Sequence, residues 1–222
     1  MKENLKTTHY ADGENLINGT GKSDISGDYT TKYWFVYEDN PAYKDTYGLL
    51  YAWAAAMNGA AGSDGNPSGV QGVCPAGWHL PGDSEWKKLE MFLGMSQSQA
   101  DATGYRGTDE GGKLKESDTT HWTSPNTGST NSSGFTALPG GLRSGSGEFS
   151  YMGTYANFWS SAENDYLTAW NRTLLYNDSE AYCLSYSKNY GFSVRCLKVS
   201  VRLSTLWWEK SGILLQIQVL RE

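Results

Sequence analysis

The apolar residues of this 222-residue chain fall into short runs separated by polar, glycine-rich segments. Residues 33–37 form one aromatic run, which predicts a strand. Between residues 47 and 57, large apolar side chains recur at helical spacing and the alanines favour a helix. Residues 59–69 contain nothing that could anchor them in a core, so we predict a flexible loop without a role.

A second helix is predicted after Pro81 and Gly82. Asp83 and Glu85 fall in its first turn, where carboxylates complement the helix dipole. Gly94 is expected to end this helix. The residues predicted to face inward from it are Trp86, Leu89 and Leu93.

The second half of the chain contains short apolar runs divided by glycines and polar turns, which predict strands. The predicted strands are residues 135–138, 157–161, 168–176, 181–186 and 192–199. Trp159 and Phe192 alternate with small residues, so we expect both in the core. Helices followed by strands predict an α+β fold, with two helices packed on a twisted antiparallel sheet and many loops.

Composition narrows the classes of function. The net charge is −6, and the 18 Lys and Arg residues form no stripe along the chain, so nucleic acid is not an expected partner. No apolar run approaches the roughly 20 residues that a membrane span needs, and the N-terminus lacks the apolar stretch of a signal peptide. We therefore expect no membrane insertion by this chain. Its 26 Gly, 9 Trp and 15 Tyr residues are typical of loop-rich extracellular binding domains.

Tyrosine, asparagine and serine dominate the segment from residue 149 to 192, with seven Tyr, five Asn and six Ser. These side chains combine rigid contact area with adaptable hydrogen bonding, as binding loops do. No single period buries them all, and we expect about half to face solvent. The predicted ligand-binding residues are Tyr151, Tyr155, Asn157, Asn164, Asp165, Tyr166, Trp170, Asn171, Tyr176, Asn177, Tyr182, Tyr186, Asn189 and Tyr190.

Candidates for catalysis and metal binding are weak by comparison. His9, His79 and His121 belong to no recognisable nucleophile–base motif, so we expect structural or solvent-facing roles. Calcium requires six to eight oxygen ligands, and the acidic residues near 163–165 and Asp178 form no compact DxDxN loop. We expect Glu163 to make a structural hydrogen bond. No cofactor is predicted.

The three cysteines are Cys74, Cys183 and Cys196, and none lies in a CxxC motif or near a histidine at ligand spacing. A structural zinc site therefore has little support. One disulfide and one remaining thiol is the simplest oxidised arrangement, and the residues alone leave the pairing open.

Eight strings of the sequence resemble the Fibrobacter succinogenes major paralogous domain family, and their order and spacing cover residues 3–198. They are ENLKTT (3–8), YGLLY (47–51), CPAGWHLP (74–81), GGKLKE (111–116), SPNTG (124–128), GFTALPGG (134–141), WSSAE (159–163) and GFSVRC (191–196). The family occurs in secreted and surface proteins, and its molecular activity is not established. The resemblance implies a single domain over residues 1–198 and an extracellular or cell-surface location.

The family is similar in turn to the C-type lectin fold and the formylglycine-generating enzyme fold. Residues 80–86 resemble the LPTxxEW helix start of the latter group, with Gly82 in place of the capping threonine. The resemblance to C-type lectin folds implies a disulfide between Cys74 and Cys196, with Cys183 left as the free thiol. The cysteines do not reproduce the pattern of the formylglycine-generating enzymes, so copper-dependent oxidation is not carried over.

Both ends of the chain depart from the family pattern. The family pattern has an opening strand before residue 3, and we expect this strand to be missing or cut off here. Residues 199–222 resemble nothing in the family, and we expect few long-range contacts and poor order there, with residues 212–220 as the exception. As an alternative, residues 212–220 occupy the sheet edge that the missing strand leaves open.

These observations predict a non-enzymatic, surface-displayed binding domain that recognises a protein or a glycan through residues of about 144–190. The abundance of Tyr, Asn, Ser and Asp also fits adenine-directed diversification by a retroelement. Two other classes stay open. One is an enzyme, either related to the formylglycine-generating group or active on glycans, and the other is a structural spacer of a surface protein.

Overall fold

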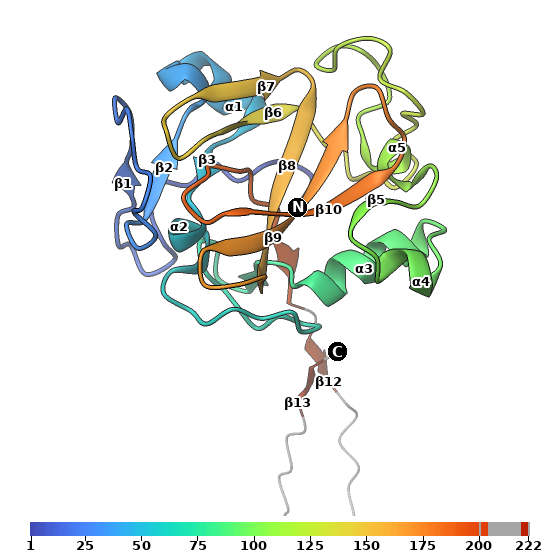
Figure 1. The fold of residues 1–222 in the computed structure, drawn as a ribbon. Coiled ribbons are helices and arrows are strands. Elements are labelled where there is room, and N and C mark those ends of the chain that lie inside the picture. Colours follow the sequence, from blue (N-terminus) through green and yellow to red (C-terminus); the bar gives the residue numbers. More distant parts are fainter. Residues whose placement is uncertain (200, 204–218, 222) are drawn as a thin grey trace, which may run out of the picture.

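The computed structural model describes residues 1–199, 201–203 and 219–221 (Figure 1). A six-stranded sheet of order β5-β10-β9-β8-β6-β7 crosses the middle of the domain. Its strands are β5 (Gly104–Arg106), β6 (Gly140–Arg143), β7 (Phe149–Met152), β8 (Tyr155–Glu163), β9 (Thr168–Leu175) and β10 (Ala181–Ser187). Neighbouring strands are antiparallel except for β6 and β8, which meet in parallel at Gly141 and Ala156.

Three small sheets complete the strands that the structure describes. One sheet has the order β1-β2-β3, and the other two are the pairs β4 with β11 and β12 with β13. Their strands are β1 (Ile17–Asn18), β2 (Tyr33–Phe35), β3 (Leu50–Tyr51), β4 (Trp78–His79), β11 (Leu197–Lys198), β12 (Val201–Leu203) and β13 (Val219–Arg221).

The helices are short. They are the 3-10 helices η1 (Tyr37–Asp39) and η2 (Pro41–Tyr43) and the α-helices α1 (Lys44–Tyr47), α2 (Trp53–Met57), α3 (Asp83–Phe92), α4 (Gln97–Ala100) and α5 (Glu110–Leu114). The protein is therefore a mixed structure, mostly sheet with few short helices, and is compatible with the predicted α+β class. None of these helices has the length and apolar character that a membrane span requires.

The single helix predicted over residues 47–57 is wrong in its extent. Gly48 interrupts it with φ 77°, and a Cβ atom there would lie 2.7 Å from the Cβ of Asn4. The chain then pairs Leu50 with Phe35 in β2, and helical geometry begins again at Trp53. Strand pairing thus overrides a helical pattern that was correct only for the alanine-rich end.

The helix predicted after Gly82 is confirmed as α3, but its predicted inward stripe is partly wrong. Trp86 is buried as expected, whereas Leu89 and Leu93 are only half-buried. Leu89 lines a small apolar hollow at the surface, and Glu90 is the fully buried residue of that turn. The inner face of α3 therefore combines an aromatic and an ionic contact.

Of the strands predicted in the second half, 157–161, 168–176 and 181–186 are confirmed as β8, β9 and β10. Residues 135–138 form no strand, since Thr136 has φ 53° and the segment makes a single bridge through Ala137. In the predicted closing segment 192–199, isolated bridges precede the two-residue strand β11.

The aromatic core is where the sequence predicted it. Trp159 and Phe192 are fully buried, with ring centroids 4.4 Å apart. Cys74 and Cys196 form the disulfide that the family resemblance implied, with Cα atoms 5.9 Å apart, and Cys183 is free and buried.

The loop of residues 59–69 has an anchor, contrary to the prediction. The Ser63 amide donates to the Ser161 carbonyl at 2.9 Å, and the Ser161 hydroxyl donates to the Ser63 carbonyl at 2.7 Å. The Ser84 amide donates to the Asp64 carbonyl at 3.1 Å, which ties the loop to the start of α3. Hydrogen bonds hold this loop in place of apolar burial, so hydropathy gives no sign of its anchor.

The prediction for the tail lies largely outside the described residues. Within residues 199–222, β12 and β13 are described and pair with each other in antiparallel register. Most of residues 212–220 fall in the part of the chain that the structure does not describe.

Candidate functional site

The predicted ligand-binding residues divide into three groups by exposure. The exposed ones are Tyr151, Asn164, Asp165, Tyr166 and Asn177. The half-buried ones are Tyr155, Trp170, Tyr176, Tyr186 and Tyr190. The buried ones, for which the prediction of ligand contact is wrong, are Asn157, Asn171, Tyr182 and Asn189.

The buried asparagines belong to internal hydrogen bonds. The Asn171 amide donates to the Thr173 hydroxyl at 3.0 Å, and this hydroxyl donates to the Asn157 side-chain oxygen at 2.8 Å. The amide of Asn157 then reaches the Gly141 carbonyl at 3.2 Å. Asn189 packs against Gly145, because a Cβ atom added to Gly145 would lie 2.7 Å from the side-chain oxygen of Asn189. These polar residues stabilise the domain interior.

Strand register separates the remaining candidates onto two faces of the large sheet. Tyr182 lies opposite Thr173, which in turn lies opposite Asn157, so all three side chains share one face. Tyr155 shares this face because strand side chains alternate. Trp170 lies three residues before Thr173 on β9, so its side chain points to the other face. The candidates therefore form two separate surfaces, and not one continuous face as predicted.

The first surface, which we call the tyrosine face, contains two ring pairs. Tyr151 and Tyr155 stack with centroids 4.4 Å apart and an interplanar angle of 14°. Tyr105 lies opposite Tyr182 in the register of β5 and β10, with ring centroids 4.2 Å apart. Burial raises the pKa of Tyr155, and the phenols of Tyr151, Tyr105 and Tyr176 raise that pKa further. Because Tyr182 and Tyr155 lie on the same face of the sheet, the two pairs belong to one surface.

Tyr105 was missed by the sequence analysis. It is 70 % exposed and lies on β5, far in sequence from the tyrosine-rich segment. It covers Tyr182, whose hydroxyl donates to Asp178. Burial, followed by this hydrogen bond, raises the pKa of Tyr182 well above its usual range. Only the pairing of β5 with β10 reveals Tyr105, because no local pattern marks it.

Tyr151 combines exposure with an unusual backbone. Its side chain is 51 % exposed, and its φ of 67° lies in the left-handed region that bulky residues rarely adopt. Such a conformation costs on the order of 1–3 kcal/mol and is found most often at functional sites. The strain presents the Tyr151 ring to solvent beside Tyr155.

Tyr186 and Tyr190 border this surface while packing on the core. Their ring centroids are 5.3 Å apart, and the ring of Phe192 lies 5.2 Å from that of Tyr186. Burial raises the pKa of Tyr186, with smaller contributions from Tyr190, Tyr155 and Tyr151. These two tyrosines therefore pack against the core and also lie at the edge of the tyrosine face.

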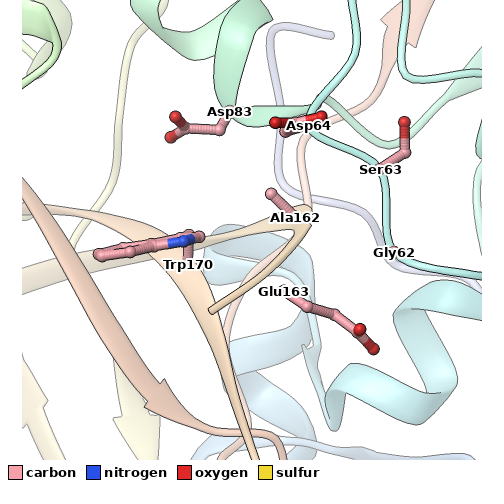
Figure 2. Close-up of a pocket in the computed structure, with 7 residues that line it drawn as sticks. All are labelled: Gly62, Ser63, Asp64, Asp83, Ala162, Glu163 and Trp170. Carbon is pink, nitrogen blue, oxygen red and sulfur yellow. The ribbon is translucent and has the colours of Figure 1, made fainter. Parts of the chain in front are cut away.

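The second surface is a hollow of about 280 Å³ beside Trp170. Figure 2 shows Asp64 and Asp83 across the hollow from the Trp170 ring. Asp64 comes from the loop of residues 59–69 and Asp83 from the start of α3. Glu163, at the end of β8, also lines this hollow.

Next to Trp170 along β9, charged side chains are buried between the sheet and α3. Arg172 donates to Glu90 at 2.7 Å and to Asp83 at 2.8 Å, and Arg106 donates to Glu90 at 2.6 Å. Arg172 also lies 3.1 Å from the thiol sulfur of Cys183. Burial opposes ionisation of Asp83, yet Arg172 and Lys87 outweigh it and lower the pKa of that carboxyl. Hydropathy assigns such charged residues to the surface, so the sequence analysis did not predict these ion pairs.

The turn between β8 and β9 holds three further candidates. The Asp165 carboxylate accepts from the amides of Leu167 at 2.8 Å and Thr168 at 2.7 Å. The Asn164 amide donates to the Thr168 hydroxyl at 3.0 Å. Asn164 and Asp165 thus close the turn, and the neighbouring Tyr166 is 85 % exposed.

Within the described residues, no three His, Cys, Asp or Glu side chains gather as metal ligands would.

Two histidines have carboxylate partners, and Glu163 has a lysine partner. His79 is buried and contacts Glu85 at 2.7 Å, while the ring of His121 lies 2.9 Å from Glu116. Glu163 accepts from Lys188 at 3.0 Å, the structural hydrogen bond expected of it. The pairs of His79 and of Glu163 connect separate segments of the fold, while the pair of His121 lies within one loop.

Comparison with known proteins gives one match. No curated protein and no solved structure is found to be similar. A family described as the Fibrobacter succinogenes major domain matches residues 1–198. The match spans most of the 222 residues and includes both surfaces. The chain therefore belongs to the Fibrobacter succinogenes major domain family.

Proposed function

We propose that this protein is a non-enzymatic, extracellular binding domain with a C-type-lectin-like fold, and that the tyrosine face contacts its ligand. The observation that carries the proposal is Tyr151, an exposed ring in a strained backbone conformation that stacks on Tyr155. Strain of this kind persists where the surroundings over-determine it, and it is concentrated at functional positions.

The chemistry of the tyrosine face favours a protein ligand over a glycan. Tyrosine is enriched in protein interfaces because it offers large contact area with few rotatable bonds and a polar tip. Tyr105, Tyr151 and Tyr155 supply rings on β5, β7 and β8, so the contact surface extends across the sheet. A tyrosine hydroxyl can both donate and accept a hydrogen bond, which suits uncharged hydrogen-bonding partners.

The abundance of Tyr, Asn and Ser also supports retroelement-directed diversification of this face. The exposed and half-buried tyrosines fit such a role, while the buried Asn157 and Asn171 are structural. The nucleotide sequence tests this part of the proposal. A near-identical template repeat beside a reverse transcriptase gene supports it, and the lack of such a repeat contradicts it.

Binding to an array of surface proteins and glycans tests the function itself. The wild-type domain is compared with a Tyr151→Ala/Tyr155→Ala variant and with Phe92→Ala, which removes an aromatic ring that is 86 % exposed on α3. A central aromatic anchor contributes about 2 kcal/mol, so the double variant should lose at least the roughly 30-fold in affinity that follows from the loss of one anchor. Phe92→Ala should bind as the wild type does. Equal loss in both variants, or retention by the double variant, would contradict the proposal.

A further inference from the structure

We propose that Trp170 is the stacking platform of a second ligand site, which binds a neutral oligosaccharide on the α3 side of the sheet. This inference is independent of the tyrosine face. Trp170 lines two hollows, the one of about 280 Å³ beside Asp64 and Asp83 and another of about 430 Å³ beside Gly104 and Ser185. One half-buried indole therefore serves two adjoining spaces. This arrangement suits a chain of sugar units better than a single small molecule.

The charges around the hollow are largely compensated. Asp83 receives Arg172 on one oxygen at 2.8 Å and Lys87 on the other at 3.1 Å. Glu163 pairs with Lys188 at 3.0 Å. Among the residues that the structure describes, Asp64 has no ion-pair partner. A strongly cationic or anionic ligand would find little net charge here, so a neutral ligand is favoured.

The polar atoms in the hollow are suited to sugar hydroxyls. An ionised carboxylate only accepts hydrogen bonds and has about four acceptor positions, so Asp64 and Asp83 can receive O–H donors from a ligand even with their present partners. The indole ring offers an apolar plane on which the C–H face of a sugar ring can pack. Figure 2 shows the ring and these two carboxylates on facing sides of the hollow.

Close packing holds the wall of this hollow in position. A Cβ atom on Gly82 would lie 2.4 Å from the Gly65 carbonyl oxygen, and one on Gly62 would lie 2.6 Å from Glu163 Cγ. The loop of residues 59–69 therefore approaches α3 and β8 more closely than any side chain at these positions permits. Together with the hydrogen bonds of Ser63 and Ser161, this fixes Asp64 opposite Trp170.

Isothermal titration calorimetry of the whole chain tests the proposal. The neutral probes are cellohexaose, xylohexaose and mannohexaose, and the charged probes are a galacturonate oligosaccharide and choline. We expect at least one neutral hexasaccharide to bind, with affinity reduced at least about tenfold by Trp170→Ala and less by Trp170→Phe. Tyr151→Ala, on the tyrosine face, should leave this affinity unchanged.

Several results would overturn the proposal. They are the absence of heat for all three neutral probes at millimolar concentration, binding of choline or the galacturonate alone, and equal affinity in Trp170→Ala and wild type. Thermal unfolding of each variant verifies folding, and Asp64→Asn, an isosteric change at an exposed position, should weaken binding without destabilising the domain. If Tyr151→Ala abolishes sugar binding while Trp170→Ala does not, the sugar belongs to the tyrosine face.

Discussion

The two faces of the large sheet differ in how they use polar chemistry. The tyrosine face carries phenol side chains, of which Tyr105 and Tyr151 are exposed. The opposite face, beneath α3, buries Glu90 between Arg106 and Arg172. Alternation along β8, β9 and β10 allows the same three strands to serve both purposes. Substitutions in the buried ionic cluster of Glu90, Arg106 and Arg172 should therefore change stability, while those of the exposed tyrosines should change binding.

The largest effect is expected from Glu90→Gln. This change removes the charge that two buried arginines share, and an uncompensated buried charge destabilises by about 3–5 kcal/mol. Glu14→Gln is the matched control, because its side chain is 55 % exposed, its partner Lys32 is 30 % exposed, and an exposed ion pair contributes at most about 1 kcal/mol. Urea unfolding measures both. If the two variants lose similar free energies of unfolding, the buried ion pairs of Glu90 contribute no more than an exposed pair, which contradicts the prediction.

Gly82→Thr should destabilise the domain next most strongly. Threonine is the better helix cap by a few tenths of a kcal/mol, but its Cβ would lie 2.4 Å from the Gly65 carbonyl oxygen. Overpacking costs about 1–3 kcal/mol, so the clash outweighs the cap. Ser84→Ala, which keeps the backbone hydrogen bond to Asp64, should have little effect. A more stable Gly82→Thr variant would refute the packing of the loop against α3.

Acid should weaken the α3 side through Asp83. The pKa of this carboxyl is lowered in the folded protein, so its charged form contributes stability that is fully present above the unfolded value of about 3.9. That contribution is lost as pH falls through the lower folded pKa. The stability difference between wild type and Asp83→Asn should therefore be constant near neutrality and shrink below about pH 4. A difference that grows on acidification would contradict this assignment.

The smallest effect on stability, and a useful one, is expected from Tyr151→Gly. Glycine adopts the left-handed conformation without strain, so relief of about 1 kcal/mol offsets the lost stacking on Tyr155. We expect unchanged or slightly raised stability together with loss of ligand binding. Differential scanning calorimetry and the array measure the two. A loss of several kcal/mol would show that Tyr151 is structural.

The sequence was sufficient for the parts of the fold that depend on local pattern. Strands β8, β9 and β10, helix α3 and the buried Trp159 follow from periodicity and punctuation. The disulfide and the family came from resemblance.

What depends on distant segments was not predictable. Tyr105 joins the tyrosine face only through the pairing of β5 with β10, and Asn157 is buried because Thr173 and Gly141 satisfy it. Local pattern assigns Glu90 of α3 to the surface, and its burial depends on ion pairs with Arg106 of β5 and Arg172 of β9. The anchoring of residues 59–69 rests on backbone hydrogen bonds, which no side-chain pattern reports.

Hydroxyl-radical footprinting of the domain, free and bound to the partner captured on the array, tests the central claim most directly. Tyr105, Tyr151 and Tyr155 should lose reactivity on binding, because the partner covers the tyrosine face. Trp170 on the opposite face and Phe92 on α3 should react equally in both states. Protection of Trp170 or Phe92, with Tyr151 and Tyr155 as reactive as in the free protein, would contradict the account.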